Sequence, residues 1–351
     1  MKKIAIIEIG GSHHECIYSQ LGFIKSPETE ITLICSANLK NAVSGFEQVN
    51  NFHFIDYEKG EWKGAFKVKN ILNKNDFDAV VINTAHGKRV RNFLILPFLK
   101  KQNFTGIAHN TKKFTSSNTQ KIINTKVKKY FVLAQYLLKD IPLSTIKGLK
   151  FDYFYSMFYP KQETKLFKKG KDEIWICIPG QVEYKRRDYK TLFNQVRAEG
   201  LNPNIKLIFL GKSKHKHGDG VAIEKEINSL GIASQCILWD GFIDDPTFYS
   251  YLLQSDYLLP LIHKGSAELS NYFTNQISGT FNLAFGYGKP LLLENAFKEY
   301  EDFKEDGLFY ETGELVNYIN SLESATREHL YKDSCFGFEE LKKRYLELVS
   351  K

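Results

Sequence analysis

Short apolar runs recur along the chain at the spacing of an α/β protein in which strands alternate with helices. In the first half these runs cover residues 3–9, 31–35, 52–55, 79–82, 106–108 and 130–133, and helical patterns such as 64–72 and 90–100 lie between them. A continuous apolar run is typical of a strand that is covered on both faces in a parallel sheet. The alternation therefore predicts a doubly wound, Rossmann-like sheet.

A second series of the same kind begins at residue 174, with strands expected at 174–178, 207–210, 236–239, 257–262 and 291–293 and a last helix at 338–349. Because 351 residues exceed what one hydrophobic core usually covers, we expect two α/β domains. The aromatic and lysine-rich stretch 151–171 breaks the pattern and is interpreted as their connection. The expected bounds are 1–155 for the N-terminal domain, 156–172 for the linker, 173–335 for the C-terminal domain, and 336–351 for a C-terminal helix that can pack back on the N-terminal domain.

The charge is divided unequally between the two halves. Residues 1–170 carry 27 Lys and Arg against 13 Asp and Glu, whereas residues 171–351 carry 21 against 27. A basic N-terminal domain predicts an anionic partner, either a phosphate-bearing substrate or an anionic membrane surface, and the alternative is a solvated lysine-rich surface. A nucleic-acid partner is not expected, because the basic residues match no known binding module. The candidate contacts are Lys100, Lys101, Lys112, Lys113, Lys126, Lys128 and Lys129.

No apolar run is long enough to span a membrane, and the five scattered cysteines form no C-x-x-C pair. We therefore expect a cytoplasmic protein with reduced thiols, which can lie peripherally at the inner face of the cell membrane. No metal site is expected. His215 and His217 alternate in a Lys/Gly-rich loop without a third ligand, which is typical of a solvated turn.

Polar side chains follow three of the predicted strands in the first half. Gly11, Ser12, His13 and Glu15 come after the first strand, His86 follows 79–82, and His109 follows 106–108. In doubly wound sheets, ligands bind outside the carboxyl ends of the strands, so these groups are expected to converge on one pocket. The first turn is not G-x-G-x-x-G, and no dinucleotide fingerprint is present.

Three motifs of the second half together suit a nucleoside diphosphate. Arg186 and Arg187 follow a Gly turn after the strand at 174–178, and guanidinium groups match phosphate geometry. The cluster 278–280 stands at a predicted helix start, where free backbone N–H groups and the helix dipole favour an anion. The third motif is a strand end followed by a glycine turn. Backbone groups of this turn can pair with the edge of a nucleobase, and its Phe can stack on the base. The residues of these last two motifs are Ser278, Gly279 and Thr280, and Gly241, Phe242 and Ile243.

The order of these motifs resembles the C-terminal domain of GT-B glycosyltransferases, in particular the large retaining family that includes sucrose and glycogen synthase relatives. The resemblance covers residues 172–295 and rests on Gly180, Arg186 or Arg187, Gly241-Phe242-Ile243, Leu258-Leu259-Pro260 and Gly288-Lys289-Pro290-Leu291. It implies two facing α/β domains with a cleft between them. It further implies the nucleotide-sugar donor on the second domain, the acceptor on the first, no cofactor besides the donor substrate, and no obligatory metal.

One departure from that family concerns its pair of Glu residues eight positions apart. The corresponding positions hold Asn275 and Leu283, so the retaining outcome is not carried over. Inverting GT-B enzymes often place a His or carboxylate after the first strand, a place that His13 or Glu15 fits as the general base. His86 and His109 would then shape the acceptor or sugar pocket, and the arginines and 278–280 would stabilise the leaving diphosphate.

The sequence thus predicts a metal-independent glycosyltransferase that moves a sugar from a nucleoside-diphosphate sugar to a glycan or lipid-linked acceptor in bacterial surface polysaccharide synthesis, such as capsule or lipopolysaccharide. Two alternatives stay open. The absent Glu pair also suits a non-catalytic partner subunit that kept the fold. A nucleotide-sugar 2-epimerase shares the fold, although such epimerases carry extra acidic residues in the cleft and this chain shows few.

Overall fold

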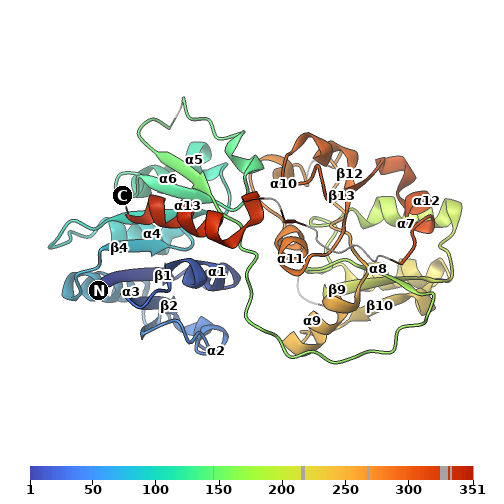
Figure 1. Cartoon of the computed structure of the whole chain (residues 1–351), viewed down its shortest axis with the longest axis horizontal. Coiled ribbons are helices and arrows are strands. Elements are labelled where there is room, and N and C mark those ends of the chain that lie inside the picture. Colours follow the sequence, from blue (N-terminus) through green and yellow to red (C-terminus); the bar gives the residue numbers. More distant parts are fainter. Residues whose placement is uncertain (145, 215–217, 267–268, 325–330, 333, 351) are drawn as a thin grey trace. The chain divides into compact units, whose positions relative to one another are not determined.

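The computed structural model describes residues 1–144, 146–214, 218–266, 269–324, 331–332 and 334–350. The chain divides into two compact units (Figure 1). Unit 1 comprises Met1–Tyr159, Thr274–Gln276 and Asp333–Lys351, and unit 2 comprises Pro160–Phe273 and Ile277–Lys332. Each unit is built around one parallel sheet.

Unit 1 contains a seven-stranded sheet in the order β3-β2-β1-β4-β5-β6-β7, with every neighbouring pair parallel. The register places Ile4 of β1 opposite Ile31 of β2 on one side and Ala79 of β4 on the other. Apolar side chains fill this centre because both faces of the sheet are covered by helices. The strands are β1 (Lys2–Glu8), β2 (Thr29–Ser36), β3 (Asn51–Ile55), β4 (Ala79–Ile82), β5 (Phe104–Ala108), β6 (Lys129–Val132) and β7 (Lys150–Tyr153).

The helices of unit 1 pack in two groups, one of which contains the last helix of the chain. The helices are α1 (Glu15–Ile24), α2 (Lys40–Val43), α3 (Glu61–Lys74), α4 (Gly87–Leu94), α5 (Lys113–Ser116), α6 (Asn118–Ile123) and α13 (Phe338–Ser350). Helix α4 packs against both α3 and α6, and α13 packs against α1 and the sheet. The ring of Tyr345 on α13 stacks on Phe131 of β6 with centroids 4.9 Å apart, and Arg344 pairs with Asp152 of β7 at 2.8 Å.

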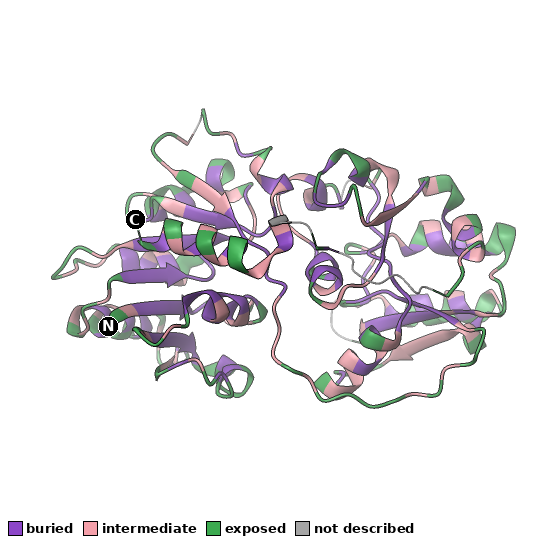
Figure 2. Cartoon of the chain, in the orientation of Figure 1, coloured by how far each residue is buried: buried purple, intermediate pink, exposed green. Residues whose placement is uncertain are grey.

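Unit 2 contains a six-stranded parallel sheet in the order β10-β9-β8-β11-β12-β13. Its strands are β8 (Ile174–Cys177), β9 (Ile205–Lys212), β10 (Cys236–Trp239), β11 (Tyr257–Leu258), β12 (Leu291–Glu294) and β13 (Gly307–Tyr310). Its helices are α7 (Tyr189–Glu199), α8 (Gly220–Ser229), α9 (Asp245–Gln254), α11 (Gly279–Tyr287) and α12 (Leu315–Asn320), and α10 (Asn271–Thr274) ends at the boundary of the two units. Strand and helix side chains form one apolar core, and Figure 2 shows the inner strands as buried, the edge strands β10 and β13 as largely intermediate, and the outer helix faces as exposed.

The doubly wound α/β class predicted from the sequence is confirmed in both sheets. Two strands were missed. Strand β7 falls in the stretch interpreted as a connection, and as an edge strand it keeps Lys150 exposed, which weakens its apolar pattern. Strand β13 buries only Tyr310 fully. The helix expected to run to residue 100 ends at Leu94, because Pro97 cannot continue a helix.

None of the helices that the structure describes has the length and apolarity needed to cross a lipid bilayer. None of the five cysteines, all of which lie in the described part of the chain, forms a disulfide.

Candidate functional site

The strand order of unit 1 reverses between β1 and β4, because the chain leaves β1 toward β2 and β3 on one side and continues through β4 to β7 on the other. Ligands of open α/β sheets bind outside the carboxyl ends of the strands at such a switch point. The loops that follow β1, β4 and β5 begin at this edge. They carry every site residue that the sequence analysis assigned to the N-terminal domain.

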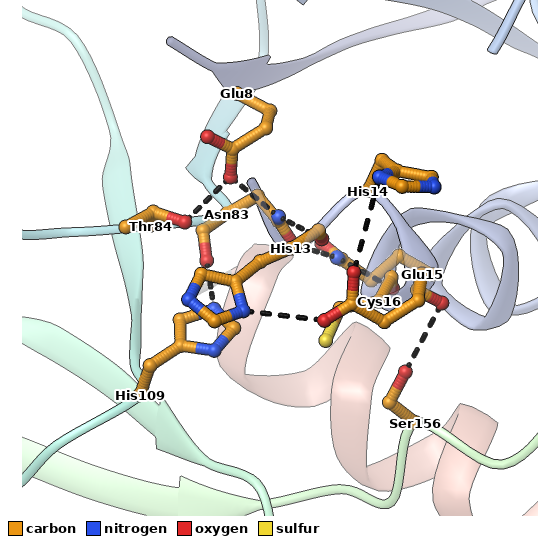
Figure 3. Close-up of polar contacts among 10 residues, drawn as sticks. Glu8, His13, His14, Glu15, Cys16, Asn83, Thr84, His109 and Ser156 are labelled. Carbon is orange, nitrogen blue, oxygen red and sulfur yellow. Dashed lines mark hydrogen bonds and ion pairs between the residues drawn. The ribbon is translucent and has the colours of Figure 1, made fainter. Parts of the chain in front are cut away.

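A buried carboxylate, Glu8, closes the end of β1 and ties the neighbouring loops together (Figure 3). Its Oε2 accepts hydrogen bonds from Asn83 Nδ2 at 2.7 Å and Thr84 Oγ1 at 2.5 Å, and its Oε1 accepts one from the Gly10 amide at 2.7 Å. Burial raises the pKa of Glu8, and these three hydrogen bonds oppose the rise without cancelling it. All of its hydrogen-bond partners are neutral groups.

Asn83 is the hub that joins this carboxylate to two histidines. Its Nδ2 also donates to the carbonyl of His13 at 2.8 Å, its Oδ1 accepts from Gln20 Nε2 at 2.6 Å, and its carbonyl lies 2.7 Å from His109 Nε2. Tyr345 on α13 donates to Gln20 at 2.9 Å and so extends the network into the core. A fully satisfied buried network of this kind holds its members in one arrangement.

His13 stands in the left-handed region with φ 62°, which is uncommon for a residue other than glycine and is often found at functional sites. Its Nδ1 lies 3.2 Å from Glu15 Oε1, and its ring stacks on His109 with centroids 3.9 Å apart. When Nδ1–H donates to the carboxylate, Nε2 keeps an unshared electron pair that can accept a proton. The side chains of both His13 and Glu15 are partly exposed, so this nitrogen belongs to a solvent-accessible site.

The electrostatics separate the three histidines of this site. Burial lowers the pKa of His109 to about 3, with the charge of His13 acting in the same direction. Burial also lowers the pKa of His86 to about 4, assisted by Lys113 and His13. Burial acts to raise the pKa of Glu15, but the hydrogen bond and charge of His13 outweigh it and leave the pKa below its usual range. His86 and His109 are therefore neutral at pH 7, beside an ionised Glu15.

The remaining predicted residues of unit 1 lie in the same loops. His86 is the N-cap of α4, and its ring meets His109 edge-on at 6.5 Å between centroids. Gly11 has φ 83°, a conformation that favours glycine, and its carbonyl accepts a bond from Asn38 Nδ2 at 3.3 Å. Ser12 is exposed beside it. The structure thus brings together all the predicted residues of the first domain with Glu8, Asn83 and Thr84, of which Glu8 is the one acidic residue in the first apolar run.

The candidate anion site of unit 2 centres on Arg187, whose side chain is only 5% exposed. Its Nη2 donates to the Pro179 carbonyl at 2.6 Å and to Thr280 Oγ1 at 3.3 Å, and its Nη1 donates to the Arg186 carbonyl at 2.7 Å. Its Nε has no hydrogen-bond partner among the residues that the structure describes, and no described carboxylate pairs with it. A buried cation held only by neutral oxygens is costly, and it favours an anion at this place.

Two features of the surrounding backbone shape this site. Gly180 has φ 107°, and a Cβ there would lie 2.9 Å from Arg187 Nη2, so the turn requires glycine. Ser278 is the buried N-cap of α11, and its Oγ accepts from the Thr280 amide at 3.4 Å. The start of α11, where the helix dipole is positive, therefore meets the buried guanidinium through Thr280. A Cβ on Gly279 would meet no atom within 4 Å, so the space above this helix start is open.

The two predicted arginines have different environments. Arg186 is 47% exposed, and its Nε donates to Glu183 Oε2 at 2.9 Å. Lys185 Nζ lies 3.2 Å from the same oxygen. Burial acts to raise the pKa of Glu183, but these two cations outweigh it and lower the pKa. Arg187, and not Arg186, is thus the arginine whose charge is left without a carboxylate.

The predicted nucleobase loop follows β10. Gly241 is exposed, the ring of Phe242 is 85% exposed, and Ile243 is buried. Asp244 begins α9 by accepting a bond from the Thr247 amide at 3.0 Å. The loop therefore presents one aromatic ring to solvent between a buried anchor and a strand end.

The two positions of the absent Glu pair lie in different surroundings. Asn275 belongs to unit 1, where its carbonyl accepts a bond from the Thr111 amide at 2.9 Å, and Leu283 is half-buried on α11. The described part of the chain holds no group of three or more His, Cys, Asp or Glu side chains arranged to bind a metal ion. His215 and His217 lie outside the described residues.

No protein-family model matches the sequence, and no curated protein matches it. Solved structures do match its fold. HepE of Anabaena in complex with UDP-glucose is 13% identical, with a TM-score of 0.63, over 100% of this chain and 95% of that one. The lipopolysaccharide outer core galactosyltransferase WaaB is 14% identical, with a TM-score of 0.59, over 99% of both chains. The chain has the GT-B glycosyltransferase fold. A putative UDP-N-acetylglucosamine 2-epimerase from Listeria monocytogenes is also similar to it, with 13% identity and a TM-score of 0.58 over 98% of this chain and 91% of that one.

Proposed function

We propose that this GT-B protein is a glycosyltransferase that moves a sugar from a nucleoside-diphosphate sugar to a hydroxyl group of a glycan or lipid-linked acceptor. The observation that carries the proposal is the buried guanidinium of Arg187 at the start of α11, which has no carboxylate partner among the described residues. A diphosphate would supply the missing negative charge. Structures of similar fold that were solved with UDP and UDP-glucose support this choice of ligand.

In this proposal unit 2 binds the donor. Arg187 and the open helix start at Gly279 stabilise the charge that develops on the diphosphate as the bond between the anomeric carbon and the phosphate oxygen breaks. The exposed ring of Phe242 stacks on the base, and the backbone of Gly241 and Ile243 pairs with its edge. Arg186 contributes less, because Glu183 already balances its charge.

Unit 1 supplies the base. His13 Nε2 accepts the proton of the acceptor hydroxyl while the acceptor oxygen bonds to the anomeric carbon, and Glu15 stabilises the resulting imidazolium through Nδ1. Neutral His86 and His109 line the pocket as hydrogen-bonding groups that do not compete for the proton. A single displacement of this kind inverts the anomeric configuration. The acceptors we propose are those of bacterial surface polysaccharides or glycoconjugates, such as capsule or lipopolysaccharide.

A nucleotide-sugar 2-epimerase is the second candidate, because epimerase structures also share the fold. Both activities take a nucleotide sugar as substrate, but only the transferase also needs an acceptor. Incubation with a nucleotide sugar alone, followed by NMR of the sugar ring, separates them. Conversion of the sugar without an acceptor would establish the epimerase, and release of nucleoside diphosphate only when an acceptor is present would establish the transferase.

Binding is tested first by thermal shift of the purified protein with UDP, GDP, CDP, dTDP and ADP. A diphosphate at 100 times its Kd adds roughly 2.7 kcal/mol to the free energy of unfolding. Arg197→Ala is a matched control, because Arg197 is exposed on α7 and pairs with Glu226 at 2.7 Å. Stabilisation that Arg187→Ala abolishes and Arg197→Ala preserves supports the donor site. Absence of stabilisation by every diphosphate at millimolar concentration would favour a non-catalytic partner subunit.

A further inference from the structure

A second charged surface lies at the opposite edge of the unit 1 sheet from His13. Three segments, residues 99–103, 121–129 and 143–150 without 145, lead into β5, β6 and β7 and therefore lie at or near the amino ends of these parallel strands. We call them together the lysine edge. They contain eight lysines and no Asp or Glu. The lysines are Lys100, Lys101, Lys121, Lys126, Lys128, Lys129, Lys147 and Lys150.

Two cavities open between these segments. One of about 580 Å³ is lined by five of the lysines, and a neighbouring one of about 570 Å³ is lined by three, with Lys128 in the wall of both. Within the described chain only Lys100 of the eight is in an ion pair, with Asp76. Lys129 is held in place by Asn103, whose Oδ1 lies 2.6 Å from its Nζ. Seven positive charges are thus gathered around concave surfaces without a carboxylate to balance them.

Each segment of the lysine edge also exposes a large aliphatic side chain. Leu99 is 82% exposed, Leu143 is 58% exposed, and Ile122 is also exposed. An acidic glycan offers no apolar surface that would cover such side chains, whereas the interface of a lipid bilayer does. The charges are all lysine, a compact and strongly hydrated cation that suits a diffuse layer of phosphates, and none is arginine, which suits one bidentate phosphate.

We propose that the lysine edge binds the phosphate headgroups of an anionic lipid bilayer, with Leu99, Ile122 and Leu143 reaching into the interface. Lys112 and Lys113, which the sequence analysis grouped with this set, follow β5 and lie at the other edge, beside His86. Membrane binding does not depend on the proposed transfer reaction, so either can fail without the other.

The position of the lysine edge has a consequence for the acceptor, which does rest on the proposed function. The strands of unit 1 have four to eight residues, which at about 3.3 Å per residue separate the two edges by roughly 15 to 25 Å. A lipid-linked acceptor must carry its reactive hydroxyl that far from the headgroups. The acceptor is then a lipid-linked glycan that earlier glycosyl transfers have already extended.

Co-sedimentation of the full chain with vesicles tests the proposal. We expect binding to phosphatidylcholine vesicles that contain phosphatidylglycerol, loss of binding at high salt, and no binding to pure phosphatidylcholine. Each lysine near an anionic surface strengthens binding about fivefold. The triple variant Lys101→Ala, Lys126→Ala, Lys150→Ala should therefore weaken partitioning about a hundredfold. Leu99→Ser with Leu143→Ser should weaken it without changing the charge.

A matched control removes the same charge elsewhere, at exposed lysines outside the lysine edge: Lys161→Ala, Lys168→Ala and Lys225→Ala. Equal loss in this control would overturn the proposal in favour of a non-specific effect of net charge. Binding of an acidic polysaccharide such as heparin without binding of anionic vesicles would overturn it in favour of a glycan-binding surface. Nucleoside diphosphate binding by the lysine-edge triple variant should equal that of the wild type, which separates this proposal from the donor site.

Discussion

Replacement of Arg187 by methionine tests the donor site most directly, because methionine keeps an unbranched side chain and removes the charge. A buried ion costs several kcal/mol of desolvation, which the variant no longer bears. Against this, the carbonyls of Pro179 and Arg186 lose their donors, at about 1–3 kcal/mol each. We expect these effects to offset, so that the free energy of unfolding without ligand changes by less than about 2 kcal/mol.

The affinity for the diphosphate should change far more than the stability without ligand. A hydrogen bond to a charged group contributes about 1.5–3 kcal/mol, so loss of one such bond from Arg187 to a phosphate weakens the Kd about tenfold to 150-fold. The measurements are urea unfolding without ligand and calorimetric titration with the diphosphate that stabilises the wild type. Arg186→Met is the comparison. It removes one of the cations that pair with Glu183 and should cost about 1 kcal/mol of stability with little loss of affinity.

Two outcomes of these assays would contradict the role of Arg187 in donor binding. An Arg187→Met protein that loses more than about 3 kcal/mol of unfolding free energy and still binds the diphosphate like the wild type would make Arg187 a structural residue. A larger affinity loss in Arg186→Met than in Arg187→Met would transfer the role to the exposed arginine.

Three further predictions concern unit 1. His13→Ala should lower kcat about 10²-fold to 10⁴-fold and leave the diphosphate Kd unchanged, since the base acts in the chemical step; an unchanged kcat with a saturating acceptor would exclude it as the base. Because the pKa of Glu8 is raised, its contribution to stability is present below its unfolded value of about 4.5 and is lost as the pH rises through the folded value. Glu8→Gln should therefore gain stability relative to the wild type as the pH rises above about 4.5 in urea unfolding, and a constant difference would contradict this. The pKa values of His109 and His86 are lowered, so the free energy of unfolding of the wild type should fall by roughly 1 kcal/mol per histidine for each pH unit below about 6.5, until the pH approaches 3 to 4. A His86→Gln, His109→Gln double variant that loses stability equally steeply would refute this assignment.

The strands and helices at the centre of each sheet could be predicted because burial on both faces leaves a continuous apolar run, as in β1 and β4. Of the edge strands, β3 and β10 could be predicted as well, but β7 and β13 could not. Strand β7 alternates polar and aromatic residues, and its pairing with β6 depends on partners more than 15 residues away in the chain. Local pattern carries no information on such contacts, so the stretch was interpreted as a connection.

The residues of the candidate site likewise include some that could be predicted from the sequence and some that could not. His13, His86 and His109 could be singled out because each follows a strand, and the carboxyl ends of parallel strands lie at one edge. The pairing of Arg186 with Glu183, and the burial of Arg187, could not be foreseen. Adjacent residues in a loop point in different directions, and which of two arginines turns inward depends on the packing around Gly180.

Each unit holds a buried charged side chain after or at the carboxyl end of a strand: at the last residue of β1 in unit 1, and in the loop between β8 and α7 in unit 2. In unit 1 this charge is Glu8, held by Gly10, Asn83 and Thr84; in unit 2 it is Arg187, held by neutral oxygens. Apolar replacements of buried charges are often neutral or stabilising, so stability alone gives no reason for either. Their surroundings suit different tasks: Glu8 binds Asn83, which also holds the His13 carbonyl, and the guanidinium of Arg187 favours a phosphate. We infer that both charges are retained for chemistry, at the expense of stability that the rest of each core supplies.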